Sequence, residues 1–319
     1  MSETGLSRMT DRVDVVLGAV RGLEYARMHP FLESLRRTAF AGEISLFTSG
    51  VSARTDAELR ERGVLVHPFR EPYLRATRGR RLYFYDDRIS RLHPLLPLAA
   101  RAAGWMTHEG SNLQIGVARR LMGVWCSRYF LYYRYLRDHP HRYANVMISD
   151  VKDVVFQRSP FEIEREAPLE CFLESERYRI GTCPINRRLV ETAYGPDTLN
   201  RIANEPISCS GVTIGSYPAM LEYLRLMMRA LADLRRQYGG IDQGVHNVLL
   251  HGGMFPEARK VANDRGAVMT LGYVLPEEMV FDDQDRLLSA DGFIVPVLHQ
   301  YDRHPMLEKR MNQLYPLAE

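Results

Sequence analysis

The stretch "NVMISDVKDVVFQRSPF", residues 145–161, indicates both how the chain folds and where its charged groups gather. An apolar run ends at Asp150, and three residues later Asp153 precedes a second apolar stretch. The first run, residues 145–149, is typical of a buried strand. Burying charge beside such a strand costs several kcal/mol unless a partner offsets it. The two carboxylates therefore call for a cation nearby.

Composition narrows the classes of protein to consider. The chain has 319 residues, of which 45% are hydrophobic and 25% charged, as in a globular protein with a substantial core. The formal net charge is only +3, so we expect no nucleic-acid partner. No apolar run approaches the roughly 20 residues of a membrane helix, and we expect no transmembrane segment. Residues 1–11 are polar, lack the apolar core of a signal peptide, and are predicted to form a disordered tail.

The four cysteines bear on the compartment. They are Cys126, Cys171, Cys183 and Cys209, and no two have the spacing of a CxxC motif. This scatter argues against a zinc ribbon or a disulfide framework, and it fits a reducing environment. We therefore expect a cytoplasmic protein.

The first part of the chain alternates between strand and helix patterns. Strands are predicted at residues 13–17, 43–47 and 64–66, and helices at residues 29–38 and 55–62. Thr55 followed by Glu58 resembles a capping box at the start of the second helix. This alternation predicts an α/β fold with an open, mostly parallel sheet, within one domain over residues 12–319.

The rest of the chain adds an insertion and a different C-terminal part. Residues 70–110 are rich in Arg, Tyr and Pro and are interpreted as a loop-and-helix insertion. An amphipathic helix is predicted at residues 115–137. Further predicted strands cover residues 169–173, 212–214 and 294–298, and further helices cover residues 218–238 and 242–250. Short strands and turns between them, with Asp291-Gly292 as a hairpin turn, predict a small antiparallel portion.

Asp150 and Asp153 are the first candidates for a functional site. Ligands of open α/β sheets bind outside the carboxyl ends of strands, where Asp150 is predicted to lie. Two close carboxylates repel each other unless a cation lies between them. Hard divalent ions prefer oxygen ligands, and a neutral imidazole can complete a manganese-type site. The pair, joined by a histidine from elsewhere, would hold Mn²⁺ or Mg²⁺; alternatively, it forms only a strand-end turn.

Five segments together resemble the GT-A glycosyltransferases, and most of all glycosyltransferase family 8 and its unclassified relatives. "MISDVKDVVFQRSPF" (147–161) resembles their metal-binding strand. The other four, in the family's order, are "CSRYFLYYRYL" (126–136), "ISCSGVTIGS" (207–216), "DQGVHN" (242–247) and "VLHQYDRHP" (297–305). The resemblance extends from about residue 13 to residue 305. It implies the GT-A fold, a twisted sheet flanked by helices.

The resemblance also implies roles for particular residues. His299 would be the third metal ligand, and Arg128 and Arg303 would contact the donor. Other donor contacts would come from the backbone of Gly18, Ala19 and Val20 and from the sugar pocket at Ser210 and Gly211. Asp242 and Gln243 would bind sugar hydroxyls or shield the reacting carbon. Glu174 and Ser175 are further candidates for a sugar or acceptor contact because they lie at another predicted strand end.

Three departures from the family pattern stand out. The acids are spaced D-x-x-D instead of D-x-D, so either Asp150 or Asp153 could be the main ligand. Cys209 replaces the usual Asn. After His299 the chain has Tyr301, Asp302 and Arg303 in place of the family's Gly and Lys, with Arg303 or His304 left to contact the diphosphate.

These observations predict a metal-dependent glycosyltransferase. The donor would be a nucleoside-diphosphate sugar, most simply UDP-linked, because a divalent ion stabilises a diphosphate leaving group. The acceptor would be a hydroxyl of a glycan, a metabolite or a protein, selected by residues 70–108. Transfer would retain the anomeric configuration, unless Asp242 acts as the base of an inverting reaction.

Two other functions remain open at this stage. One is a catalytically inactive GT-A fold protein that binds a nucleotide sugar or a glycan. The other is a nucleotidyltransferase, but such enzymes usually carry a Gly-rich loop with a Lys or Arg after the first strand. Here that loop reads Ala19-Val20-Arg21-Gly22, which is a poor match.

Overall fold

A seven-stranded sheet forms the centre of the computed structural model, which describes residues 12–71, 73–75, 81–83, 102, 111–234 and 239–317. Its strands are β1 (Val13–Arg21), β2 (Glu43–Ser49), β3 (Leu65–Pro68), β6 (Tyr143–Ser149), β8 (Leu169–Leu173), β9 (Ser208–Ser216) and β10 (Ala258–Val261). They lie in the order β10-β8-β9-β6-β1-β2-β3. Only β9 runs against its neighbours, β6 and β8; the other pairs are parallel. The predicted mostly parallel α/β sheet is confirmed.

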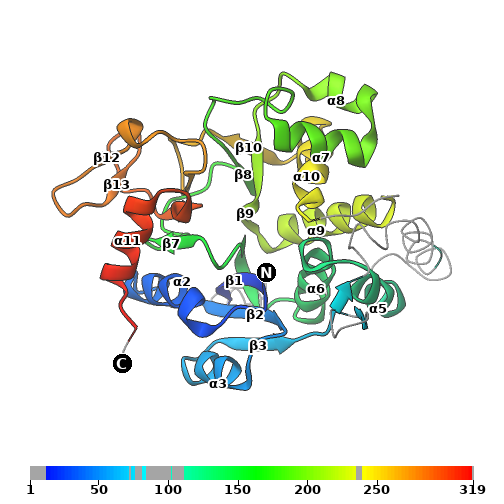
Figure 1. Cartoon of the computed structure of the whole chain (residues 1–319), viewed down its shortest axis with the longest axis horizontal. Coiled ribbons are helices and arrows are strands. Elements are labelled where there is room, and N and C mark those ends of the chain that lie inside the picture. Colours follow the sequence, from blue (N-terminus) through cyan, green and yellow to red (C-terminus); the bar gives the residue numbers. More distant parts are fainter. Residues whose placement is uncertain are drawn as a thin grey trace, which may run out of the picture.

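Helices cover both faces of this sheet (Figure 1). The helices in the described residues are α2 (Tyr25–Arg37), α3 (Ala53–Glu61), α5 (Asn112–Leu121), α6 (Val124–Asp138), α7 (Pro184–Tyr194), α8 (Pro196–Ile202), α9 (Tyr217–Ala232), α10 (Ile241–His251) and α11 (Pro305–Leu314). Of these, α11 packs on the small C-terminal strands and not on the central sheet. Alternate residues of β1 point to opposite faces, as strand geometry requires. Val15 and Leu17 pack into a core with α6, α9 and α10. Val16 and Val20 pack into a second core with α2 and α3.

A smaller unit is formed by the C-terminal part together with one strand from the middle of the chain. It comprises β7 (Val154–Phe156), β11 (Val268–Thr270) and β14 (Val297–His299), a hairpin of β12 (Val280–Phe281) and β13 (Leu287–Leu288), and two short 3-10 turns, η3 (Pro276–Glu278) and η4 (Tyr301–Arg303). The amide of Gly292 donates to the carbonyl of Ser289 at 3.0 Å, and Leu288 pairs antiparallel with Ile294. The predicted turn at Asp291-Gly292 is confirmed. The predicted antiparallel character holds for β12–β13 and β7–β14, but β11 and β14 are parallel.

Several element boundaries differ from the prediction. The helix expected at residues 115–137 is two helices, because Gly123 is the N-cap of a new helix, α6. The first strand does not end at Leu17 but continues to Arg21, paired with β2 along its length. The N-cap of α3 is Ser52, whose hydroxyl accepts a hydrogen bond from the amide of Thr55. Our capping-box interpretation at Thr55 was therefore wrong by one turn.

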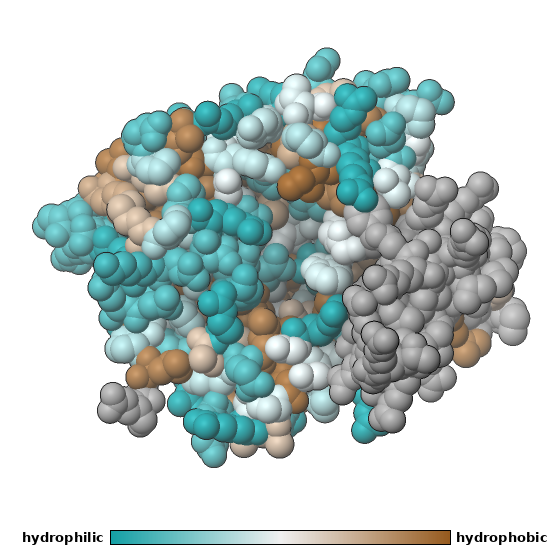
Figure 2. Space-filling view, viewed as in Figure 1, coloured by the Kyte–Doolittle hydropathy of each residue, from teal (hydrophilic) through white to brown (hydrophobic). Residues whose placement is uncertain are grey.

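Some predictions fall outside the described residues. These are the tail at residues 1–11 and most of the insertion at residues 70–110. Within the insertion, β4 (Tyr73–Arg75) and β5 (Arg81–Tyr83) pair antiparallel, so its described part includes a hairpin that we did not predict. Among the described residues, no helix combines the length and apolarity needed to span a membrane. Hydrophilic residues predominate over the described surface in Figure 2, with hydrophobic ones in separate patches.

Candidate active site

Strand pairing brings Asp150, Asp153 and His299 together. Asp150 follows the last residue of β6, and its amide donates to the carbonyl of Gly211 at 2.7 Å. Asp153 precedes β7, which pairs antiparallel with β14 so that Val154 lies opposite His299. One potential ligand atom from each of the three side chains lies within 4.8 Å of the other two. The three side chains predicted to bind a metal, here called the metal group, thus lie together at the carboxyl end of β6.

The surroundings of His299 fit a divalent cation. Its imidazole is fully buried, and Nδ1 lies 3.3 Å from the hydroxyl of Thr270. Nε2 lies 3.6 Å from Asp150 Oδ2 and makes no hydrogen bond within the described part of the chain. A Cβ atom at Gly211 would come within 2.5 Å of His299 Cε1 and 2.7 Å of Asp150 Oδ2. Glycine therefore leaves room between Asp150 and His299, an oxygen donor and a nitrogen donor of the kinds that a Mn²⁺-type ion accepts.

Arg128 is the buried cation beside this group. From α6, its Nη1 donates to Asp150 Oδ1 at 2.6 Å and its Nη2 donates to Asp242 Oδ2 at 2.8 Å. Burial alone would raise the pKa of Asp150, but Arg128 and then His299 lower it to about 2. Burial raises the pKa of Asp153, which lacks such a close cation. Asp150 is therefore the carboxylate that is firmly held in its ionised form.

Asp242 and Gln243 lie in the first turn of α10 and are fixed by hydrogen bonds. Asp242 Oδ2 also accepts from Tyr129 at 3.2 Å and from the hydroxyl of Ser210 at 3.4 Å. Gln243 Oε1 accepts from the amide of Ser210 at 2.8 Å, and its Nε2 donates to Glu174 Oε1 at 3.1 Å. Both predicted residues and Ser210 thus belong to one network with Arg128. Burial raises the pKa of Asp242 and of Glu174.

Gly18, Ala19 and Val20 lie near the metal group because β1 packs against the loop that follows β6. Gly18 pairs with Ser149, one residue before Asp150. A Cβ at Gly18 would lie 2.4 Å from Val151 and 2.8 Å from Leu46, so glycine allows the loop after β6 to approach β1. Ala19 is half-buried beside it, and the side chain of Val20 belongs to the core. These contacts explain why Gly18 is glycine without any ligand.

Arg303 and His304, the two candidates for a diphosphate contact, have different surroundings. Arg303 is exposed, with its Nε 3.8 Å from Asp302 Oδ1. His304 instead shares a 2.8 Å hydrogen bond with the carbonyl of Leu271, so it is engaged in the fold. Of the two candidates for a diphosphate contact, Arg303 is the one left available.

Sequence reasoning missed several residues that support the site. Thr270 holds the imidazole of His299, and Asn263 fixes Thr270 through hydrogen bonds to its amide and its carbonyl. Asn186 Oδ1 accepts from Gln243 Nε2 at 3.3 Å. It lies on α7, a helix that we did not predict. The role of Thr270 follows from the pairing of β11 with β14, for which the sequence offered no signal.

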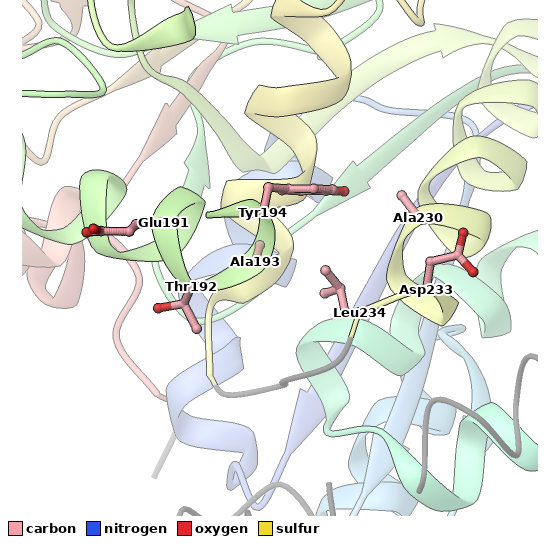
Figure 3. Close-up of a pocket in the computed structure, with 7 residues that line it drawn as sticks. All are labelled: Glu191, Thr192, Ala193, Tyr194, Ala230, Asp233 and Leu234. Atoms are coloured by element: carbon pink, nitrogen blue, oxygen red, sulfur yellow. The ribbon is translucent and has the colours of Figure 1, made fainter. Parts of the chain in front are cut away.

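One cavity borders the hydrogen-bond network of Gln243, and another lies apart from it. One of about 610 Å³ is lined by Glu174, Ser175 and Asn263 among others, next to the partners of Gln243 and Thr270. Another of about 640 Å³ lies between α7 and the end of α9, where Figure 3 shows Tyr194 on one side and Asp233 on the other. None of the predicted site residues lines the second cavity, which we therefore do not connect with the metal group.

Comparisons with known proteins add the following. No family profile and no curated protein matches the sequence. Among solved structures, the galactosyltransferase LgtC with donor and acceptor sugar analogues has a TM-score of 0.44 and 14% identity, over 96% of this chain and 97% of that chain. Core-mannan synthase A from Aspergillus fumigatus, in a form with Mn and GDP, has a TM-score of 0.39 and 13% identity, over 77% and 72%.

Glucosyl-3-phosphoglycerate synthase from Mycobacterium tuberculosis is a third similar structure. Its complex with Mn²⁺, UDP and glucosyl-3-phosphoglycerate has a TM-score of 0.37 and 13% identity, over 80% of this chain and 71% of that chain. Similarity at this level leaves the assignment of a reaction to the residues themselves.

Proposed function

We propose that this protein is a metal-dependent glycosyltransferase of the GT-A fold, related to glycosyltransferase family 8. It transfers a sugar from a nucleoside-diphosphate sugar, UDP-linked in the simplest case, to a hydroxyl of a glycan, a metabolite or a protein. The observation that carries the proposal is the group formed by Asp150, Asp153 and His299 at the end of β6. Four free, buried cysteines fit action in a reducing compartment such as the cytoplasm.

The metal group would hold Mn²⁺ or Mg²⁺ through Asp150, Asp153 and His299. When bound, such an ion supplies Lewis-acid stabilisation of the negative charge on a diphosphate leaving group. The buried Nε2 of His299, which has no hydrogen-bond partner in the described part of the chain, supports this assignment. Asp150 divides its oxygens between Arg128 and His299, so it would share its charge between the guanidinium and the ion.

Arg128 provides fixed positive charge that needs no rearrangement during the reaction. Its guanidinium is held on two sides, by Asp150 and by Asp242, before any substrate binds. Preoriented charge of this kind stabilises charge that develops in a transition state, commonly by about 3 kcal/mol per group. We assign to Arg128 the electrostatic support of the donor.

Asp242 acts through Arg128 in this proposal. Its carboxylate is 2% exposed, and Oδ2 receives hydrogen bonds from Arg128, Tyr129 and Ser210. A general base needs a free lone pair within reach of the acceptor proton. The burial of Asp242 and the three hydrogen bonds to its Oδ2 therefore favour a retaining transfer over an inverting one with Asp242 as the base.

The remaining predicted residues shape the substrate pocket. Gln243 is oriented by Ser210 on one side and by Glu174 on the other, so its amide would bind a sugar hydroxyl in exchange for one of these contacts. The backbone of Ser210 and Gly211 would border the donor sugar, and the end of β1 at Gly18, Ala19 and Val20 would border the base. The cavity beside Glu174 and Ser175 would receive the acceptor.

A transfer assay tests the proposal. Wild-type protein is incubated with Mn²⁺, a panel of UDP- and GDP-sugars and mixed acceptors, and release of nucleoside diphosphate is measured with and without EDTA. We expect activity that EDTA abolishes and that His299→Ala abolishes, whereas His141→Ala, at an exposed histidine, leaves it unchanged. Full activity of His299→Ala, or of the wild type in EDTA, would contradict the proposal.

A second candidate function has specific support in the sequence. The D-x-x-D spacing and Cys209 depart from the family pattern, which would suit a protein that binds a nucleotide sugar without turning it over. Tight binding of UDP by the folded protein, with neither hydrolysis nor transfer across the donor panel, would favour this candidate.

A further inference from the structure

Lys152 lies between the two acids, and its side chain forms an ion pair with a third carboxylate. Its Nζ lies 3.0 Å from Asp302 Oδ2. The side chain of Lys152 is 46% exposed, whereas that of Asp302 is only 10% exposed. This ion pair connects the loop between Asp150 and Asp153 with the turn that follows His299, so it lies across the edge of the metal group.

Asp302 contacts a second cation. Arg303 Nε lies 3.8 Å from Asp302 Oδ1, too far for a hydrogen bond. This oxygen is buried and has no hydrogen-bond partner among the described residues. A buried carboxylate oxygen without a donor is unusual in a folded protein. Asp302 thus pairs closely with Lys152 and more distantly with Arg303 beside the metal group.

Both sides of this arrangement are anchored. On the Lys152 side, Val151 is buried against Gly18. On the other side, Tyr301 is buried in a core, and the amide of Gln300 donates to the carbonyl of Asp153 at 2.7 Å. Gln300 has a φ of 59°, a left-handed conformation that is unfavourable for most residues other than glycine. The backbone is therefore held so that the two loops stay adjacent.

We propose that Lys152 binds the donor's diphosphate beside Arg303, the contact that the resemblance implies, and that Asp302 occupies the place of this anion until the diphosphate displaces it. The inference rests on the proposed function, since it assigns the diphosphate contacts of that site. Asp302 keeps the two cations beside the metal group in the free protein. The more highly charged diphosphate then replaces a single carboxylate.

The strengths of the contacts agree with such an exchange. An ion pair with a half-exposed lysine is weak and screened by salt. Phosphate oxygens accept charge-assisted hydrogen bonds from Lys and Arg that are stronger than neutral ones. Displacement of Asp302 thus costs little and brings both cations to the phosphates.

Binding of inorganic pyrophosphate in the presence of Mn²⁺, measured by calorimetry, tests the inference without turnover. We expect Lys152→Met to weaken binding about tenfold, the loss of one charge-assisted hydrogen bond. Asp302→Asn should tighten binding severalfold, because it removes the competing charge while it keeps the shape. Lys309→Met, which removes an exposed lysine from α11, should leave binding unchanged, and Lys152→Arg should retain most of it. The melting temperature of each variant is recorded to confirm folding.

The outcomes separate this inference from the proposed function. If the Lys152–Asp302 pair only fastens the two loops, Asp302→Asn weakens binding or leaves it unaltered, and the inference is wrong. It is also wrong if the wild type does not bind pyrophosphate, or if Lys152→Met binds it as well as the wild type does. If pyrophosphate binds with the expected pattern but no sugar nucleotide supports transfer, the inference holds and the proposed function fails.

Discussion

Replacing Arg128 with Met should destabilise the protein more than a typical surface substitution, and the structure indicates by how much. Arg128 is 6% exposed and is paired with Asp242, which is 2% exposed. Removing the guanidinium leaves the Asp242 carboxylate buried without a cation. Breaking a buried ion pair in this way costs about 3–5 kcal/mol. We therefore expect Arg128→Met to lower the free energy of unfolding by about that amount at pH 7.

Urea unfolding followed by circular dichroism gives the comparison. The double variant Arg128→Met/Asp242→Asn should recover at least about half of the loss, because position 242 then carries no buried charge. As a matched control, Arg54→Met removes an arginine that is 87% exposed in its pair with Glu58. The control should change the free energy of unfolding by less than about 0.5 kcal/mol.

The dependence on pH supplies a further check on this reasoning. Without Arg128, burial would raise the pKa of Asp242 further above its unfolded value, so the folded variant binds a proton more readily than the unfolded chain does. The deficit relative to the wild type should therefore shrink as the pH falls from 7 toward 4. A loss below about 1 kcal/mol at pH 7, or no recovery in the double variant, would refute the idea that Asp242 is held by Arg128.

Three other predictions concern buried positions. Burial lowers the pKa of His246 from 6.5 to about 3, so the unfolded chain binds a proton before the folded protein does. The free energy of unfolding should therefore fall by about 1.4 kcal/mol per pH unit below 6.5. Urea titrations of the wild type and of His246→Asn at pH 7 and 5 measure this fall, and an equal pH dependence of the two proteins would contradict it. Gly211→Ala should abolish Mn²⁺ binding in calorimetry because its Cβ would occupy the metal group, whereas Gly116→Ala, where a Cβ meets nothing within 4 Å, should not. Gly18→Ala should lower the free energy of unfolding by about 1–3 kcal/mol through overpacking against Val151, and an unchanged urea midpoint would show that the loop simply moves aside.

The sequence was most informative where a pattern is local and strongly apolar. The strand at residues 169–173 was predicted with the bounds that β8 has, because five consecutive residues fit a buried strand. The D-x-x-D stretch placed Asp150 and Asp153 at a strand end, and the structure places both there. The meeting of these acids with His299 required the resemblance, since no local pattern specifies that β14 pairs with β7.

The missed elements share a physical cause. Helices α7 and α8 each begin at a proline and are separated by Gly195. Proline and glycine are common in loops as well as at helix ends, so they did not identify these helices. The break at Gly123 is equally ambiguous, since a glycine can lie within a helix at a modest cost. The Lys152–Asp302 pair was beyond sequence reasoning because it joins residues 150 positions apart through tertiary packing alone.

Anomalous diffraction from crystals soaked in Mn²⁺ and UDP tests the central claim most directly. The account predicts a manganese peak bonded to Asp150, Asp153 and His299, with the diphosphate of UDP on its open side. A peak at another site, or none at these three side chains when UDP is visibly bound, would contradict it.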